Sequence, residues 1–322
     1  MERRAPADLV TIVIPTLNEA GAIGRVLDEV RGHGFTRIIV VDGGSTDGTR
    51  EIAASRGARV VVQEGRGKAD AIRTAVRLVD TPYTLIMDGD WTYSAAYIGR
   101  LLEEALKRGY DEVIGARLRG RENIPLLNRF GNWVITKAFN LLFGTSLSDV
   151  CSGMYLVRTD VLRRLDFECR GFSVEVEVAA TVASSSRRIG EIPISYRRRI
   201  GRPKLGKRHG ITILLDAIRL AVRYNPTFLI AGLGATITIP ALAILAWVAL
   251  ELVFRGVKHH IWAILGMTAL AMGLLSLLIA VLSLFVKRVE YRLLSLIAEL
   301  QDELRRLQAR RQILNRQGRR VP

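Results

Sequence analysis

The chain has 322 residues, a mass of 35.7 kDa and a formal net charge of +16. Apolar residues make up 49% of it and charged residues 24%, which excludes wholesale disorder. Two cysteines are too few for a disulfide-rich scaffold or a zinc ribbon. We interpret Cys151 and Cys169 as reduced packing residues, with one oxidised pair as the alternative.

Short apolar runs alternate with helical patterns in the first part of the chain. We expect strands at residues 10–14, 38–41, 59–62 and 84–87, and helices at residues 20–31, 47–56, 68–79 and 95–108. Strands that are apolar throughout and alternate with helices are typical of a mainly parallel sheet with helices on both faces. The sequence therefore predicts an α/β fold, with residues 1–210 as one soluble domain.

Acidic residues follow three of the predicted strands: Glu19 the first, Asp42 the second, and Asp88 with Asp90 the fourth. Ligands of parallel sheets bind beyond the carboxyl ends of the strands. Crowded carboxylates repel one another, so we expect a cation nearby, and two aspartates separated by one small residue suit a hard divalent ion. Turn formation would explain one such strand end; three aligned ends favour a metal site.

Two long apolar runs, residues 227–254 and 261–286, follow this domain. Each exceeds the roughly 20 residues that a helix needs to cross a membrane, and buried helices of a soluble core are the alternative. Basic residues are dense before the first run and after the second, but sparse in the short loop between them. The positive-inside rule then predicts a multi-pass protein of the cell membrane with both termini and the soluble domain in the cytoplasm. We attribute the net charge to an anionic membrane surface, because the sequence has no nucleic-acid recognition motif.

Amphipathic segments lie on both sides of the apolar runs. Residues 211–226 are predicted to form an interfacial helix, with a helix packed on the soluble domain as the alternative. Residues 287–322 are predicted to form a basic cytoplasmic helix with leucines at heptad spacing. This spacing indicates helix pairing within one chain or between the subunits of a homo-oligomer; the alternative is a solvated amphipathic tail.

The order of the motifs resembles that of the family 2 glycosyltransferases with a GT-A fold. The resemblance rests on residues 15–19, 42–49 and 88–90, and it covers about residues 9–210 by motif. The motif at residues 149–154 and the apolar hairpin narrow it to the branch of dolichol-phosphate mannose synthases and polyprenyl-phosphate glycosyltransferases. A GT-A domain followed by a two-helix transmembrane hairpin is the implied architecture.

The resemblance implies a nucleotide-sugar site at the carboxyl edge of the sheet. Pro15, Thr16 and Glu19 would line the nucleotide pocket, and Asp42 would contact the base. Lys68 is expected to contact the nucleotide as well.

The resemblance also implies a Mg²⁺ or Mn²⁺ cofactor. Asp90, together with Asp88, would hold the ion against the diphosphate, and Asp88 would lie near the ribose or the sugar. Some relatives have a glutamine two residues after the second aspartate, where this chain has Thr92, so we leave the identity of the further protein ligand open.

The implied acceptor is a lipid monophosphate, whose own oxygen attacks the anomeric carbon, so a strong general base is not essential. Arginine suits phosphate geometry, and Arg117, Arg129, Arg202 and Lys204 are the candidate acceptor-phosphate ligands. Solvated or lipid-facing side chains are the alternative for each of these cations. Asp149 is expected near the reacting centre, and with Arg117, Asp88 and Asp90 it completes the predicted catalytic set.

Glu175 and Glu177 open a further predicted helix, and a favourable charge at a helix N-terminus explains at least one of them.

The predicted function is inverting transfer of a hexose from a nucleotide sugar to dolichyl or polyprenyl phosphate. GDP-mannose is the favoured donor, and UDP-glucose and UDP-GlcNAc are alternatives. A processive polysaccharide synthase is a second hypothesis, although the sequence lacks the Gln-x-x-Arg-Trp motif usual in such enzymes. A non-catalytic membrane scaffold is a third.

Overall fold

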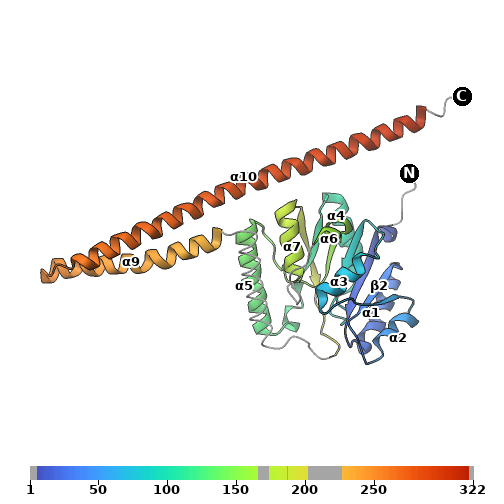
Figure 1. Cartoon of the computed structure of the whole chain (residues 1–322). Helices are drawn as coiled ribbons and strands as arrows, with labels where there is room; N and C mark the ends of the chain where they lie inside the picture. The colour runs from blue at the N-terminus through green and yellow to red at the C-terminus, as the bar shows by residue number, and fades with distance from the viewer. Residues whose placement is uncertain (1–5, 166–173, 187, 202–226, 319–322) are drawn as a thin grey trace. The chain divides into compact units, whose positions relative to one another are not determined.

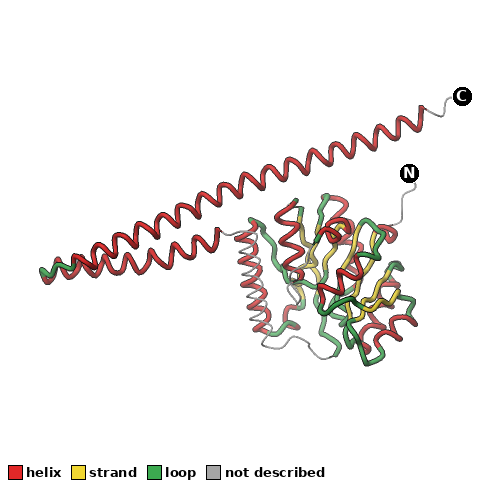
Figure 2. The backbone as a smooth tube through the Cα atoms, in the orientation of Figure 1, coloured by secondary structure: helices red, strands yellow, loops and turns green. Residues whose placement is uncertain are grey.

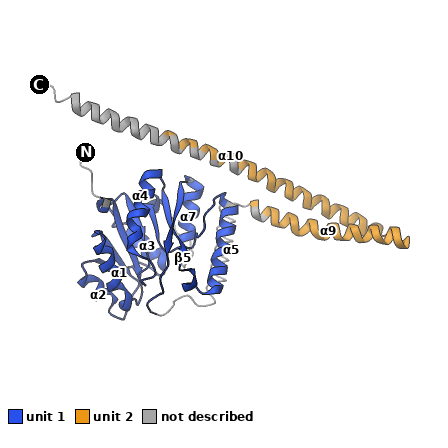
Figure 3. Cartoon of the chain, turned by 180° about the vertical axis from the view of Figure 1, so that it is seen from behind, with its two compact units in different colours: residues 1–220 blue, residues 221–322 orange. Residues whose placement is uncertain are grey.

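The computed structural model describes residues 6–165, 174–186, 188–201 and 227–318 (Figure 1). The chain divides into two compact units, residues 1–220 and 221–322, which are coloured separately in Figure 3. The predicted interfacial helix at residues 211–226 lies outside the described residues.

The first unit contains a seven-stranded sheet with the order β3-β2-β1-β4-β6-β5-β7. The prediction of a mainly parallel α/β fold is confirmed, and β6 is the exception because it runs antiparallel to both β4 and β5. In chain order the strands are β1 (Val10–Thr16), β2 (Ile38–Asp42), β3 (Arg59–Val62), β4 (Tyr83–Ile86), β5 (Glu112–Arg119), β6 (Tyr155–Arg158) and β7 (Ile189–Ser195).

Helices alternate with these strands, as Figure 2 shows in red and yellow. They are α1 (Ala20–Gly32), α2 (Thr49–Ser55), α3 (Lys68–Val76), α4 (Ile98–Arg108), α5 (Leu126–Phe143), α6 (Thr159–Arg164) and α7 (Val174–Ser185), with short 3-10 turns at Pro6–Leu9, Ala95–Tyr97 and Arg121–Asn123.

Local hydrogen bonds explain two differences from the predicted helix boundaries. The helix expected at residues 95–108 begins with a 3-10 turn, because the Ser94 hydroxyl accepts the backbone N–H of Ala96. The helix expected at residues 47–56 begins at Thr49, because Asp47 accepts the N–H groups of Ala20 and Thr49 instead of continuing the helix.

The hydrophobic core lies on both sides of the sheet. Alternate residues of β1, namely Val10, Ile12 and Ile14, join a buried cluster with Ile23 and Leu27 of α1 and with residues of α2 and α4. On the other side α3 contacts β1 and β2. Burial on both faces explains why these strands are apolar throughout.

The second unit is a pair of helices, α9 (Thr227–Arg255) and α10 (His260–Gly318). Ile230–Arg255 and His260–Val286 are long and apolar enough to cross a membrane. The two helices approach closely: the Thr227 and Ser283 hydroxyls are 2.6 Å apart, and Ser276 donates to the carbonyl oxygen of Ile230 at 2.9 Å. The second apolar run and the predicted C-terminal helix are one continuous helix.

Candidate active site

The acidic strand ends meet because β1, β2 and β4 are neighbours in the sheet. β1 pairs in parallel with both other strands, and Thr16 lies opposite Asp42. The N–H of Met87 donates to the carbonyl of Val13 at 3.1 Å, so the pairing of β4 with β1 extends to Met87, the residue before Asp88. The motifs after these three strands therefore share one edge of the sheet.

Side chains join the first two strand ends. The Ser45 hydroxyl accepts the N–H of Asn18 at 2.8 Å, and the Asn18 side-chain oxygen accepts the N–H of Thr46 at 2.9 Å. Asn18 has a φ of 51°, in the left-handed region that asparagine tolerates. The polar residues of both motifs thus give this edge a fixed backbone shape.

Asp42 is fully buried, yet one of its oxygens has no hydrogen-bond partner. Oδ2 accepts the N–H groups of Gly44 at 3.0 Å and Ser45 at 2.9 Å, whereas Oδ1 makes no hydrogen bond with any described residue. An unpaired buried acceptor is costly, so Oδ1 suits an N–H donor of a ligand. Pro15 and Thr16 lie at the end of β1, where Thr16 pairs with Asp42, and their role in a nucleotide pocket stays a prediction.

One arginine neutralises two of the predicted site acids. Arg199 donates to Glu19 Oε1 at 2.6 Å, and its Nη1 lies 2.9 Å from Asp90 Oδ2. The other Asp90 oxygen accepts the backbone N–H of Thr92 at 3.1 Å and its hydroxyl at 2.5 Å. Both oxygens of Asp90 are therefore paired within the protein, one of them with the Thr92 hydroxyl.

Asp88 and Asp90 fit a divalent ion that is shared with a substrate. Burial and then the charge of Asp88 raise the pKa of Asp90, so added positive charge would stabilise both carboxylates. The described residues contain no group of three His, Cys, Asp or Glu that could hold a metal ion. Mg²⁺ typically takes one or two carboxylates and completes its shell with phosphate oxygens and water, which this pair allows if Asp90 exchanges Arg199 for the ion.

Lys68 joins two carboxylates. Its Nζ lies 2.6 Å from Asp88 Oδ1 and 2.5 Å from Glu175 Oε1. Burial lowers the pKa of Lys68, but the charges of Asp88 and Glu175 outweigh it and hold that pKa well above its ordinary value. On the other side of Asp88, a Cβ at Gly153 would overlap Asp88 Oδ2. Asp88 is therefore held between an ammonium group and a glycine.

Arg117 and Asp149 are predicted site residues that lie far apart in the sequence, and they form a buried bidentate pair. Arg117 donates from Nε to Oδ2 at 2.6 Å and from Nη2 to Oδ1 at 2.8 Å, and Nη2 also donates to the Cys151 carbonyl at 2.9 Å. The side chains are 9% and 8% exposed. The guanidinium lies over the Tyr196 ring, 5.4 Å from its centroid. The arginine fork expected to hold a phosphate is thus directed at Asp149.

Arg129 lies in the first turns of α5 and is exposed. The same helix exposes large apolar side chains, at 57–75% each: Leu126, Leu127, Phe130, Trp133 and Leu141. The rings of Phe130 and Trp133 stack with centroids 6.0 Å apart. Large apolar residues exposed together on one helix are typical of interaction surfaces. Arg202 and Lys204 lie outside the described residues.

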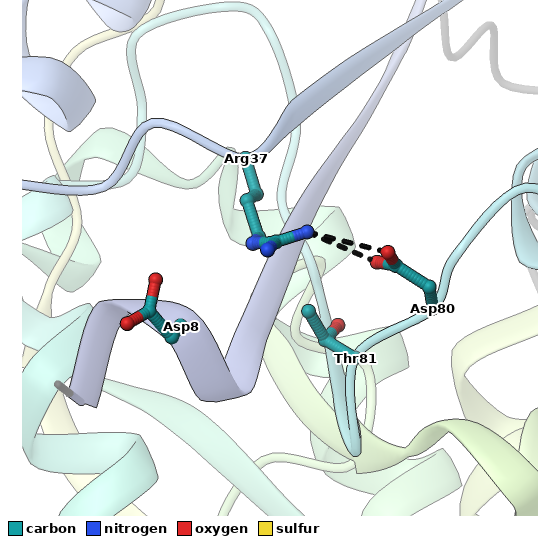
Figure 4. Close-up of a pocket in the computed structure, with 4 residues that line it drawn as sticks. All are labelled: Asp8, Arg37, Asp80 and Thr81. Atoms are coloured by element: carbon teal, nitrogen blue, oxygen red, sulfur yellow. Dashed lines mark hydrogen bonds and ion pairs between the residues drawn. The ribbon is translucent and has the colours of Figure 1, made fainter. Parts of the chain in front are cut away.

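A hollow at the other end of the sheet has a different character. It is lined by Asp8, Arg37, Asp80 and Thr81, which precede β1, β2 and β4, and Arg37 forms an ion pair with Asp80 at 3.2 Å (Figure 4). Since ligands of parallel sheets bind at the carboxyl ends, we place no chemistry there.

The sequence prediction missed Arg199. It lies in a run of three arginines after β7, where composition alone distinguishes none of them. Arg197 and Arg199 are partly buried, whereas Arg198 is exposed. Arg197 pairs with Glu29 and lies over the Trp91 ring. This alternation is that of an extended segment, and a period of two past β7 groups Arg199 with Arg197 and separates both from Arg198.

Comparison with known proteins gives one family. The family profile described as Glycosyl transferase family 2 matches residues 11–166. Glycosyltransferase AglJ of Haloferax volcanii is 36% identical over 282 residues, covering 86% of this chain and 93% of that protein. The dolichyl-phosphate hexose transferase of the same organism is 37% identical over 202 residues, covering 62% of this chain and 87% of that protein.

A solved structure has a similar fold. Glucosyl-3-phosphoglycerate synthase from Mycobacterium tuberculosis, in complex with Mn²⁺, UDP-glucose and phosphoglyceric acid, has a TM-score of 0.57 at 22% identity. The match covers 66% of this chain and 80% of that one. It supports the GT-A type of fold.

Proposed function

The chain belongs to glycosyl transferase family 2, and we propose that it transfers a hexose from a nucleotide sugar to the phosphate of a dolichyl or polyprenyl lipid. The observation that carries the donor half is the shared sheet edge of Asp42, Asp88 and Asp90. This edge has a buried hydrogen-bond acceptor without a partner, Asp42 Oδ1, and a pair of carboxylates that suits a divalent ion. Two relatives are named as a glycosyltransferase and a dolichyl-phosphate hexose transferase.

Three features support the lipid half of the proposal. A relative at 37% identity is named a dolichyl-phosphate hexose transferase. The chain carries two helices long and apolar enough to cross a membrane. α5 exposes an apolar surface with Phe130 and Trp133, and aromatic rings of this kind favour the membrane–water interface. We place residues 1–210 in the cytoplasm, with residues 211–226 and the two spans anchoring them at the leaflet that holds the lipid phosphate.

The donor sugar is proposed as mannose carried by GDP, with UDP-glucose and UDP-GlcNAc as alternatives. The similar solved structure holds UDP-glucose, so both nucleotide classes belong in the first assay. Asp42 Oδ1 is the atom proposed to contact the base, and Pro15, Thr16 and Glu19 are the proposed walls of the nucleotide pocket. Lys68 is proposed to act on this site by holding Asp88 through their ion pair.

The residues of this chain organise the reaction by charge. The acceptor phosphate oxygen attacks the anomeric carbon from the face opposite the leaving nucleoside diphosphate, which inverts that centre. A bound Mg²⁺ or Mn²⁺ held by Asp88 and Asp90 would stabilise the charge that develops on the diphosphate. Arg117, Arg129, Arg202 and Lys204 are the proposed cations for the acceptor phosphate. Asp149 orients Arg117 through the bidentate pair.

The decisive experiment uses the purified full-length protein in detergent. Radiolabelled GDP-mannose, UDP-glucose and UDP-GlcNAc are supplied one at a time with Mg²⁺ or Mn²⁺ and dolichyl phosphate. A lipid-extractable glycosyl phosphate supports the proposal, a polymer indicates a processive synthase, and no turnover with no nucleotide binding indicates a scaffold.

Asp90→Asn tests the site itself, because it keeps the shape of the side chain and removes its charge. We expect loss of turnover and of metal-assisted nucleotide binding. Asp80→Asn is the matched control, since Asp80 lies at the opposite end of the sheet and its side chain is 76% exposed. Undiminished turnover in Asp90→Asn would refute the metal assignment.

A further inference from the structure

Glu175 has an unpaired oxygen beside the metal motif. It is the second residue of α7, and its side chain is 7% exposed. Oε1 receives the Lys68 ammonium at 2.5 Å, whereas Oε2 is shielded from solvent and makes no hydrogen bond with the described part of the chain. A buried carboxylate oxygen without a partner has lost its hydration without compensation, so this atom requires an explanation beyond a favourable helix-end charge.

Lys68 places this carboxylate next to the proposed reacting edge. The same Nζ lies 2.6 Å from Asp88 Oδ1, so a single ammonium group separates the two carboxylates. The Asp88 side chain is 33% exposed, whereas those of Lys68 and Glu175 are 12% and 7% exposed. Asp88 therefore faces the open side of the site, and Glu175 forms the wall behind it. Asp88 and Glu175 contact the same ammonium group, so a ligand bound at Asp88 is separated from Glu175 by one side chain.

The charge of this group selects the chemistry of its ligand. Glu175 Oε2 lies behind a second carboxylate, Asp88, so this side of the site disfavours a phosphate that no cation accompanies, whereas a neutral hydrogen-bond donor suits the unpaired oxygen. The Tyr155 hydroxyl, also buried and without a partner among the described residues, adds a second polar group. Burial and then the charge of Glu175 raise the pKa of Tyr155. A sugar ring offers several hydroxyl donors to such a wall.

We infer that Glu175 is a specificity-determining residue that accepts, through Oε2, a hydrogen bond from a hydroxyl of the donor hexose. The inference rests on the proposed function, because it requires a nucleotide-sugar donor at this edge. It assigns the sugar to the Asp88–Lys68–Glu175 side of the site and the base to Asp42. The competing explanation is that Glu175 only positions Lys68, and through it Asp88.

The test compares nucleotide binding with and without the sugar. Full-length wild type and Glu175→Gln are titrated calorimetrically in detergent and Mn²⁺ with UDP, UDP-glucose, GDP and GDP-mannose. We expect Glu175→Gln to lower the affinity for the sugar nucleotide by about tenfold or more. The affinity for the matching free nucleoside diphosphate should change by less than about twofold. Equal weakening of both probes, or weakening of neither, overturns the inference. Wild type that binds none of the four probes overturns the proposed function as well.

Two further variants keep the test decisive. Glu177→Gln removes a buried carboxylate from the same helix turn and should change both affinities in parallel, if at all. If Glu175→Gln does not fold, Glu175→Asp keeps the charge and withdraws Oε2 by one methylene, and the same ratio is measured. Monodeoxy donors then locate the hydroxyl, because the deletion that weakens wild type should leave Glu175→Gln unaffected. A series in which every deletion affects both proteins equally also overturns the inference.

Discussion

The buried pair of Arg117 and Asp149 should be a strongly coupled element of stability. Replacing one partner by an apolar residue, as in Arg117→Met or Asp149→Leu, leaves the other charge buried at about 8–9% exposure without a counterion. The double variant Arg117→Met/Asp149→Leu removes both charges and leaves a largely apolar contact. We therefore expect the stability losses of the two single variants to add up to more than the loss of the double variant.

The magnitude follows from the contacts. Two side-chain hydrogen bonds of 2.6 and 2.8 Å join the charged groups, and unit charges about 4 Å apart attract by about 4 kcal/mol at an effective dielectric constant near 20. Breaking a buried pair from one side typically costs about 3–5 kcal/mol, because the surviving charge stays desolvated. Each single variant should lose about that amount, and the double variant should cost about 2–4 kcal/mol less than the sum of the two.

The assay is thermal unfolding of the full-length protein in one detergent for all four proteins. A loss of this size should lower the unfolding midpoint of each single variant by on the order of 10 °C. Additive losses in the double variant would contradict the pairing. If Arg117 acted only on the acceptor phosphate, Arg117→Met would be as stable as wild type. Nucleotide binding by Arg117→Met is measured in parallel.

Three other perturbations have defined outcomes. Gly153→Ala should displace Asp88, lower stability by about 1–3 kcal/mol and abolish measurable turnover, because the added methyl overlaps the carboxylate. Burial raises the pKa of Glu112 well above its ordinary value, so its contribution to stability is complete below its unfolded pKa and is lost as the pH rises through the folded one. Glu112→Gln lacks this loss. Above about pH 5 its free energy of unfolding should therefore rise relative to that of wild type by up to about 1.4 kcal/mol per pH unit, measured by unfolding at several pH values. Replacing Phe130 and Trp133 by serine should slow transfer to dolichyl phosphate in vesicles several-fold and leave transfer to a short, water-soluble prenyl phosphate unchanged.

Matched variants control these measurements. Gly99→Ala adds a methyl where no atom lies within 4 Å and should not lower turnover. A pH-independent difference between wild type and Glu112→Gln would contradict the assignment of a raised pKa. Leu106→Ser removes an apolar side chain of α4 that is 51% exposed, and an equal effect on the vesicle assay would show that α5 has no special role.

Much of the donor side of the site was predictable because it is local in sequence. Asp42 is the last residue of β2, Asp88 and Asp90 come two and four residues after the end of β4, and parallel strands bring such positions to one edge. Arg199 and Glu175 were not assigned to the site, because they act from segments more than eighty residues further along the chain. A helix-end charge was the expectation for at least one of Glu175 and Glu177, and only the tertiary structure shows that Glu175 contacts Lys68.

The sequence by itself determined the α/β class, the acidic edge and the two apolar helices, because hydrophobic period and strand-end residues are properties of short segments. Only the tertiary structure decided which charges neutralise one another: Arg117 with Asp149, Arg199 with Glu19 and Asp90, and Lys68 with Asp88 and Glu175. The reason is that ion pairs depend on distances across the fold, and a chain rich in arginine offers many pairings that its order alone does not rank.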